Sequence, residues 1–176
     1  MKTTPVIYIT QGQCQISLDP DTEISTILGS CVAACLWDVE ARVGGMNHFL
    51  LPFGAKAGVG GSLRYGVHSM ETLINGLLGK GATRRNLRAK LFGGATMSAN
   101  LGNIGSDNAK FAQEYLANED IICVAADLEG PYARRVLFRP TTGHARVMTV
   151  RMTDVGVPID IDAVLPEHRT NDCVLF

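Results

Sequence analysis

Short runs of β-forming residues, separated by Gly, Pro, Asn or Asp, recur along most of the chain and limit the folds open to it. Runs of this length build sheets, and their spacing favours antiparallel or mixed pairing. The expected strands span residues 6–10, 15–18, 32–37, 43–51, 88–92, 121–126, 135–138 and 146–152.

Two other segments carry the periodicity of amphipathic helices. One apolar stripe runs from Val67 to Leu78 and is expected to stop at 79–81, and a shorter one runs from Ala109 to Leu116. Asn103 and Ser106 are candidate N-caps for the second helix. The predicted fold class is therefore α/β, a layered sandwich of mixed or antiparallel sheet with flanking helices.

The length of 176 residues and a hydrophobic content of 46% are enough for one sizeable core, so a single domain is expected over 1–176. No composition shift marks a boundary inside it. Residues 154–176 form a C-terminal tail of uncertain structure, with a packing arm, a disordered segment or a partner-binding segment as alternatives.

Charge and cysteine content limit the kinds of partner that the chain can bind and the cellular compartment in which it is expected. A formal net charge of −1 gives no long-range field for nucleic acid or an anionic membrane, and no apolar run approaches the roughly 20 residues of a membrane span. The five cysteines are an odd number in a chain that begins without an apolar signal segment. A soluble cytoplasmic protein with reduced thiols is expected, without nucleic acid or membrane insertion.

Cys31 and His48 are the candidate reactive pair. If residues 32–37 and 43–51 form a hairpin closed by 38–41, the register places Cys31 opposite His48, with Cβ atoms ~4.5–5.5 Å apart. A neighbouring imidazolium lowers the pKa of a thiol, and the turn at Gly29 and Ser30 can bring backbone N–H groups beside the sulfur. A buried core cysteine and a hydrogen-bonded core histidine are the alternative interpretation.

The residues around this pair resemble the CheD family of chemoreceptor glutamine deamidases. The resemblance covers roughly residues 5–152, and Gly-Ser-Cys with the distant His block is its most specific part. It is carried by Ile-Leu-Gly-Ser-Cys-Val-Ala-Ala-Cys at 27–35, Gly-Gly-Met-Asn-His-Phe-Leu-Leu-Pro at 44–52, Leu-Phe-Gly-Gly-Ala-Thr-Met at 91–97, and Asn-Ile-Gly-Ser-Asp-Asn at 103–108.

What the resemblance implies is a cysteine-protease-like site that hydrolyses receptor glutamine side chains to glutamate through a thioester, with release of ammonia. The family's nucleophile corresponds to Cys31 and its base to His48. Its hydroxyl residue, six positions before the cysteine, corresponds to Ser25, where threonine is usual, and Thr26 is the adjacent alternative. No metal or other cofactor is expected.

The implied partners are methyl-accepting chemotaxis receptors, through their cytoplasmic helical region, and a CheC-type response-regulator phosphatase. The alternative function is a non-enzymatic chemotaxis regulatory module that binds such a phosphatase. The preference for amide over methyl ester stays open, as does the role of Gly93 and Gly94, which either line the site or only turn the chain.

Overall fold

The computed structural model describes residues 4–52, 58–97, 102–150 and 173–176. Strands make up most of the described elements, with two long helices between them. In chain order the elements are β1 (Val6–Tyr8), β2 (Cys14–Ser17), β3 (Glu23–Leu28), β4 (Val32–Asp38), β5 (Val43–Asn47), α1 (Gly58–Gly79), the 3-10 turn η2 (Arg84–Asn86), β6 (Arg88–Gly93), α2 (Ile104–Asn118), β7 (Ile122–Leu128), β8 (Ala133–Arg139), β9 (His144–Val150) and β10 (Cys173–Leu175).

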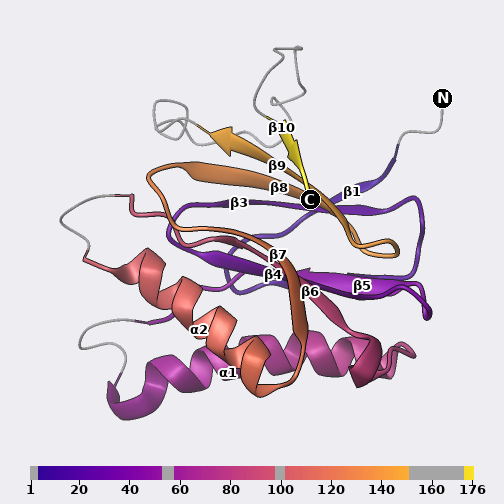
Figure 1. Ribbon diagram of the computed structural model, residues 1–176, viewed down its shortest axis with the longest axis horizontal. Coiled ribbons are helices and arrows are strands. Elements are labelled where there is room, and N and C mark those ends of the chain that lie inside the picture. The colour runs from indigo at the N-terminus through magenta and orange to yellow at the C-terminus, as the bar shows by residue number, and fades with distance from the viewer. Residues whose placement is uncertain (1–3, 53–57, 98–101, 151–172) are drawn as a thin grey trace.

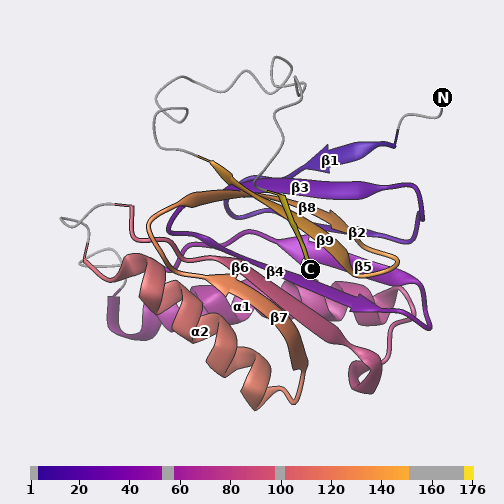
Figure 2. The same ribbon diagram turned by 45° about the horizontal axis from the view of Figure 1, so that its top comes forward.

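These elements form three layers (Figures 1 and 2). Sheet A has the order β1-β3-β8-β9-β10, and sheet B has the order β2-β5-β4-β6-β7. The pairs β1–β3 and β6–β7 are parallel and the other pairs are antiparallel. Both helices pack on the face of sheet B that points away from sheet A. The expected α/β sandwich with mixed sheet and flanking helices is confirmed.

Strand β4 lies at the centre of the molecule, and every residue in it is buried. Side chains alternate between the two faces of a strand, so β4 contributes to two separate apolar clusters. Val32, Ala34 and Leu36 pack toward the helices. Ala33, Cys35 and Trp37 pack toward sheet A. Because β4 is covered on both faces, it is a rigid support for the residues at its two ends.

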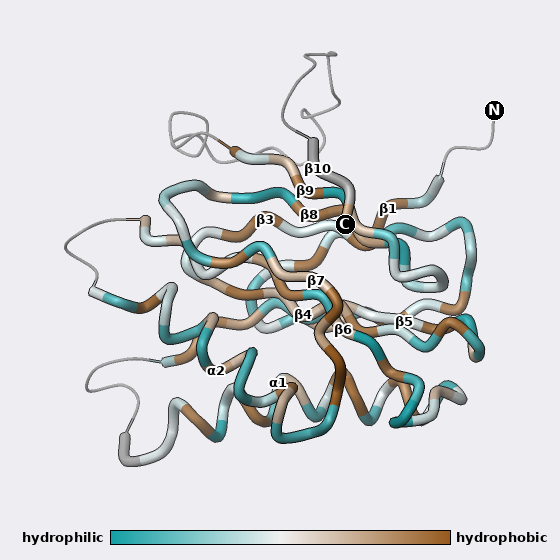
Figure 3. Tube along the Cα trace, in the orientation of Figure 1, coloured by the Kyte–Doolittle hydropathy of each residue, from teal (hydrophilic) through white to brown (hydrophobic). Residues whose placement is uncertain are grey.

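The two helices follow the predicted amphipathic pattern, and Figure 3 shows hydrophobic and hydrophilic residues alternating along both. Helix α1 ends at Gly79, inside the predicted stop. Helix α2 has Asn103 at its N-cap position, whereas Ser106 lies within its first turn. Within the described residues, no helix is both long and apolar enough to span a membrane.

Two of the described strands, β3 and β10, were not predicted from the sequence, and β3 matters for the site. β3 occupies Glu23–Leu28, where no strand was expected, and pairs with β1 on one side and β8 on the other. β5 ends at Asn47, before the expected end at 51, and β9 begins at His144, two residues before the expected start at 146, while residues 151 and 152 lie outside the described part of the chain.

The predicted tail is described only at its end, because residues 154–172 lie outside the described part of the chain. Strand β10 pairs with β9, and the backbone of Phe176 exchanges hydrogen bonds with Ala145. The Phe176 ring contacts Phe92 edge-on at 5.6 Å between centroids. The last residues therefore add a strand to sheet A and a ring to the core between the sheets.

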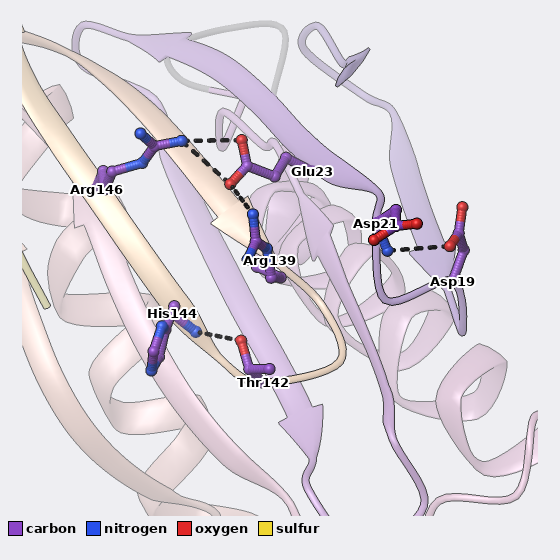
Figure 4. A network of polar contacts seen from close by, with 7 residues as sticks. All are labelled: Asp19, Asp21, Glu23, Arg139, Thr142, His144 and Arg146. Atoms are coloured by element: carbon purple, nitrogen blue, oxygen red, sulfur yellow. Dashed lines mark hydrogen bonds and ion pairs between the residues drawn. The ribbon is translucent and has the colours of Figure 1, made fainter. Parts of the chain in front are cut away.

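Sheet A carries an ionic network around Glu23 (Figure 4). The Glu23 carboxylate accepts a hydrogen bond from Arg139 Nη2 at 3.0 Å, and bonds from Arg146 Nη2 at 3.1 and 2.9 Å. The Glu23 side chain is only 9% exposed, while the two arginines remain partly in solvent. The network ties β3 to β8 and β9.

Candidate functional site

The candidate reactive side chains lie at one end of the sandwich, just outside the strands that hold them. Cys31 precedes β4, and His48 follows β5. Since β4 and β5 are antiparallel, the start of one lies beside the end of the other. The same end receives the loop after β6 and the start of α2.

The hairpin register differs from the prediction by two residues. Asp38 pairs with Val43 and Cys35 with Met46, and Val32 forms an isolated bridge with Phe49, so Cys31 is not directly opposite His48. The carboxylate of Asp38 causes the shift, because it accepts the N–H groups of Glu40 and Ala41 and moves the loop one residue along.

A shift of two residues preserves the faces of a strand, whereas a shift of one reverses them. Continuing the observed register places His48 opposite Ala33, on the face that Cys31 shares. Cys31 packs against the cluster between the sheets, as Ala33 does. The predicted direct pairing is wrong, but the two side chains do belong to the same face.

The imidazole of His48 is held by a hydroxyl from β3. His48 Nδ1 lies 2.7 Å from Thr26 Oγ1, and the Thr26 hydroxyl donates to the carbonyl of Ile9 at 2.7 Å. A hydroxyl has a single proton. Because Thr26 donates its proton to the Ile9 carbonyl, Thr26 Oγ1 accepts a hydrogen bond from His48 Nδ1–H. In the neutral ring, Nε2 then carries the lone pair. That atom is buried and without a hydrogen-bond partner in the described part of the protein.

Ser25, the residue expected beside the imidazole, lies elsewhere. Its hydroxyl donates to the carbonyl of Val136 at 3.0 Å. Ile24 and Leu28 belong to the core between the sheets, so Thr26, which alternates with them, faces inward and Ser25 faces the opposite side. Counting six positions back from Cys31 had indicated Ser25. The structure instead places the adjacent alternative, Thr26, beside the imidazole.

Burial shifts both reactive groups toward their neutral forms. Desolvation lowers the pKa of His48 from 6.5 to about 4. Desolvation also raises the pKa of Cys31 from 9.0 to about 11, and the residue's own backbone N–H opposes this by lowering it. The expected resting thiolate beside an imidazolium is not what this environment stabilises. A neutral thiol and a neutral imidazole are favoured at pH 7.

The glycine pair at the end of β6, Gly93 and Gly94, lies against the backbone of Cys31. Gly94 N donates to Cys31 O at 2.7 Å, and a Cβ on Gly93 would meet the same oxygen at 2.2 Å. Gly93 also has a φ of +108°, which other residues rarely adopt. The pair thus contacts the segment that carries Cys31 directly, in addition to turning the chain.

Asn108 joins the two segments that carry the pair, and no individual role was expected for it from the sequence. This fully buried side chain of α2 donates to Ser30 O at 2.9 Å and accepts from Leu51 N at 2.8 Å. In a trans peptide the N–H points opposite to the C=O, so a Ser30 carbonyl held by α2 directs the Cys31 N–H away from the helix. A buried polar residue in an otherwise apolar helix face was the available signal.

No cluster for a metal ion is found within the described ranges, where no three His, Cys, Asp or Glu side chains group together. The four cysteines with described side chains are free thiols, and Cys31 is half-buried. The protein is therefore a two-sheet α/β protein. At one end of the sandwich, the half-buried thiol of Cys31 and the imidazole of His48, which a hydroxyl holds in place, lie on the same face of sheet B.

Comparison with known proteins names the family. Residues 50–149 match the family model described as CheD chemotactic sensory transduction. The "Probable chemoreceptor glutamine deamidase CheD 1" of Ruegeria sp. (strain TM1040) is 50% identical over 145 residues, which are 82% of this chain and 77% of that protein. The chain belongs to the CheD family, as its resemblance predicted.

Two further relatives show how much of the chain is shared. The "Probable chemoreceptor glutamine deamidase CheD" of Zymomonas mobilis is 46% identical over 172 residues, covering 97% of this chain and 92% of its own. The protein of that name from Acidiphilium cryptum is 53% identical over 143 residues, covering 80% and 75%. Among solved structures, Neisseria meningitidis NMB0706 matches 72% of this chain and 62% of its own, with a TM-score of 0.42 and 11% identity.

Proposed function

We propose that this protein is a cytoplasmic chemoreceptor glutamine deamidase, in which Cys31 is the nucleophile, His48 the proton carrier and Thr26 the residue that orients the imidazole. The names of the relatives supply the reaction and the substrate class. The observation that carries the residue assignment is the Thr26–His48 contact, which leaves Nε2 unprotonated and, among the described residues, without a partner on the face of Cys31.

The chemistry begins from neutral groups. As Cys31 Sγ attacks the side-chain Cδ of a receptor glutamine, His48 Nε2 removes the thiol proton, so the thiolate forms only during attack. The protonated His48 then gives that proton to the departing nitrogen, and ammonia leaves. Water, deprotonated by the same Nε2, hydrolyses the thioester and releases glutamate.

The negative charge on the carbonyl oxygen needs a donor near the sulfur. The backbone N–H of Cys31 is the candidate donor, because it lies close enough to the sulfur to lower the pKa of the thiol, against the larger effect of desolvation. Asn108 directs this N–H through the Ser30 carbonyl, and Gly94 holds the Cys31 carbonyl. These contacts fix the donor before the substrate arrives, so little reorganisation is needed during the reaction.

A Cys31→Ala variant tests the proposal, with Cys14→Ala as its matched control. Cys14 is also half-buried and its pKa is also raised to about 11 by desolvation, but it packs against the cluster that faces the helices, whereas Cys31 packs against the cluster between the sheets. Purified receptor cytoplasmic fragment is incubated with each variant, and ammonia release and the mass of the modified peptides are measured. Cys31→Ala is expected to fold and release no ammonia, while Cys14→Ala keeps its activity. Activity in Cys31→Ala would refute the proposed nucleophile.

Docking of a CheC-type phosphatase, the finer partner prediction, is separable from catalysis. Cys31→Ala changes one half-buried side chain and should leave a docking surface intact. Calorimetric titration of both the wild-type chain and this variant with such a phosphatase is expected to give the same affinity. Absence of binding to either chain would remove this partner and leave the deamidase proposal unaffected.

A further inference from the structure

The loop between β1 and β2 is a rigid turn beside the thiol. Gln13 N donates to Thr10 O at 3.0 Å, and Gly12 at the third position has a φ of +85°, the pattern of a type II turn. The Gln13 side chain strengthens it, because its Oε1 accepts from Thr10 N at 2.8 Å. Gln11 is the second residue of this turn and points its side chain outward from a fixed backbone.

This turn is bonded to the residues that hold the imidazole. Gly12 N donates to His48 O at 2.7 Å, and His48 N donates to Gln13 O at 3.0 Å. The carbonyl of Ile9, just before the turn, accepts the Thr26 hydroxyl. The backbone of Gln11 is therefore fixed relative to His48 by bonds on both sides.

The side chain of Gln11 reaches the sulfur. Its Oε1 lies 3.8 Å from Cys31 Sγ and accepts the thiol proton. Among the described residues, no other side chain hydrogen-bonds to this sulfur. Gln11 is exposed to solvent, so a substrate can reach its carboxamide without displacing core side chains.

We propose that Gln11 is the residue that recognises the substrate's carboxamide and selects amide over ester, an inference that rests on the proposed function of Cys31. A carboxamide bound for attack places its carbon at Sγ and its NH₂ group beside the same sulfur. Gln11 Oε1, which accepts the S–H in the resting protein, accepts a substrate N–H once the thiol proton moves to His48.

The selectivity follows from the donors each compound offers. An amide nitrogen has two N–H groups, one of which remains available to Gln11 while the nitrogen receives a proton from His48. A glutamate methyl ester has no N–H group, and the glutamate product presents only acceptor oxygens to Gln11 Oε1. Gln11 thus stabilises the bound amide and its departing nitrogen, gives nothing to the ester, and disfavours retention of the product.

Gln11→Ala tests this role, because it removes the exposed carboxamide and leaves the backbone bonds of the turn. Gln113→Ala, an exposed glutamine on α2, is the matched control. The substrates are two synthetic peptides of a receptor helix, identical except for glutamine or glutamate γ-methyl ester at one modified position. Ammonia and methanol release give kcat/KM for each, and iodoacetamide labelling of Cys31 reports on the thiol.

Gln11→Ala is expected to lower kcat/KM for the amide about three- to tenfold, the size of one neutral hydrogen bond, with ester hydrolysis within about twofold. Gln113→Ala changes neither. An equal loss on both substrates, or unchanged or faster amide hydrolysis, overturns the inference, and faster hydrolysis together with faster Cys31 labelling identifies Gln11 as an obstruction. Activity in Cys31→Ala in the same assay would instead overturn the proposed nucleophile.

Discussion

The polar groups on the two faces of strand β3 differ in how completely their hydrogen bonds are made. On one face Glu23 binds Arg139 and Arg146, and each of its carboxylate oxygens has a partner. On the other face Thr26 holds one nitrogen of His48, while the second nitrogen is buried and without a partner in the described structure. Glu23 and Thr26 are three positions apart, yet both oxygens of the Glu23 carboxylate have partners, whereas His48 Nε2 has none among the described residues.

This contrast separates a structural polar cluster from one that is available for chemistry. The Glu23 carboxylate is bound by two arginines on both of its oxygens, so it ties strands together through charge-assisted hydrogen bonds and has no free acceptor, although Arg139 Nε is without a partner in the described structure. A buried nitrogen without a partner costs stability, and proteins retain such groups where a substrate or a reacting proton will satisfy them. We therefore expect changes on the face of β3 that carries Thr26 to affect activity, and changes around Glu23 to affect stability.

The largest effect is expected for His48→Ala. This variant removes the only base proposed for both steps, and turnover of receptor fragment should fall about 10³–10⁴-fold, the size of loss seen for members of nucleophile–base sites. Single-turnover ammonia release measures it. Thermal unfolding is the control, because the variant also removes the contact between Thr26 and His48 Nδ1, and the loss of turnover must be measured on a variant that is folded. Turnover within tenfold of wild type would contradict the role of His48.

The next effect is on the pH dependence of Cys31 labelling. Since the pKa of Cys31 is raised to about 11, its thiolate fraction and its rate of alkylation should rise about tenfold per pH unit from pH 7 to 10. Peptide mapping after iodoacetamide treatment separates Cys31 from the exposed Cys123. A rate that is already constant between pH 5 and 8 would show a resting thiolate–imidazolium pair instead.

Adjacent hydroxyls on the two faces of β3 give the sharpest matched pair. Thr26→Val keeps the side-chain volume and removes the bond to His48, so kcat/KM should fall roughly tenfold. Ser25→Ala removes only the bond to Val136 and should leave kcat/KM within about twofold. Thr26→Ser should restore most of the activity. A larger loss from Ser25→Ala than from Thr26→Val would reverse the assignment.

The smallest effect on activity is expected for Glu23→Gln. The variant removes the charge that Arg139 and Arg146 share, and because both arginines are partly exposed the unfolding free energy should fall by only about 1 kcal/mol. Urea unfolding measures it, and kcat/KM should not change. Glu114→Gln breaks an exposed pair with Lys110 and should alter neither quantity. A clear loss of activity in Glu23→Gln would show that the two faces of β3 are coupled and would contradict this prediction.

Much of this organisation was predictable from local sequence. Both helices, most strands and the α/β layering follow from hydrophobic periodicity, because one turn or one pleat decides which side chains share a face. Strand β3 was missed, although Ile24, Thr26 and Leu28 alternate as strand residues do. With that strand assigned, the same alternation would have favoured Thr26 over Ser25.

The order of residues along the chain was enough to indicate the CheD family, which the comparisons confirm, and to suggest Cys31 and His48 as the candidate pair. The contacts that cross between segments depend on the tertiary structure. The carboxylate of Asp38 set the hairpin register, the pairing of β3 with β8 turned Thr26 inward, and burial made both reactive groups neutral. Each of these depends on residues brought together from distant parts of the chain, which local patterns do not contain.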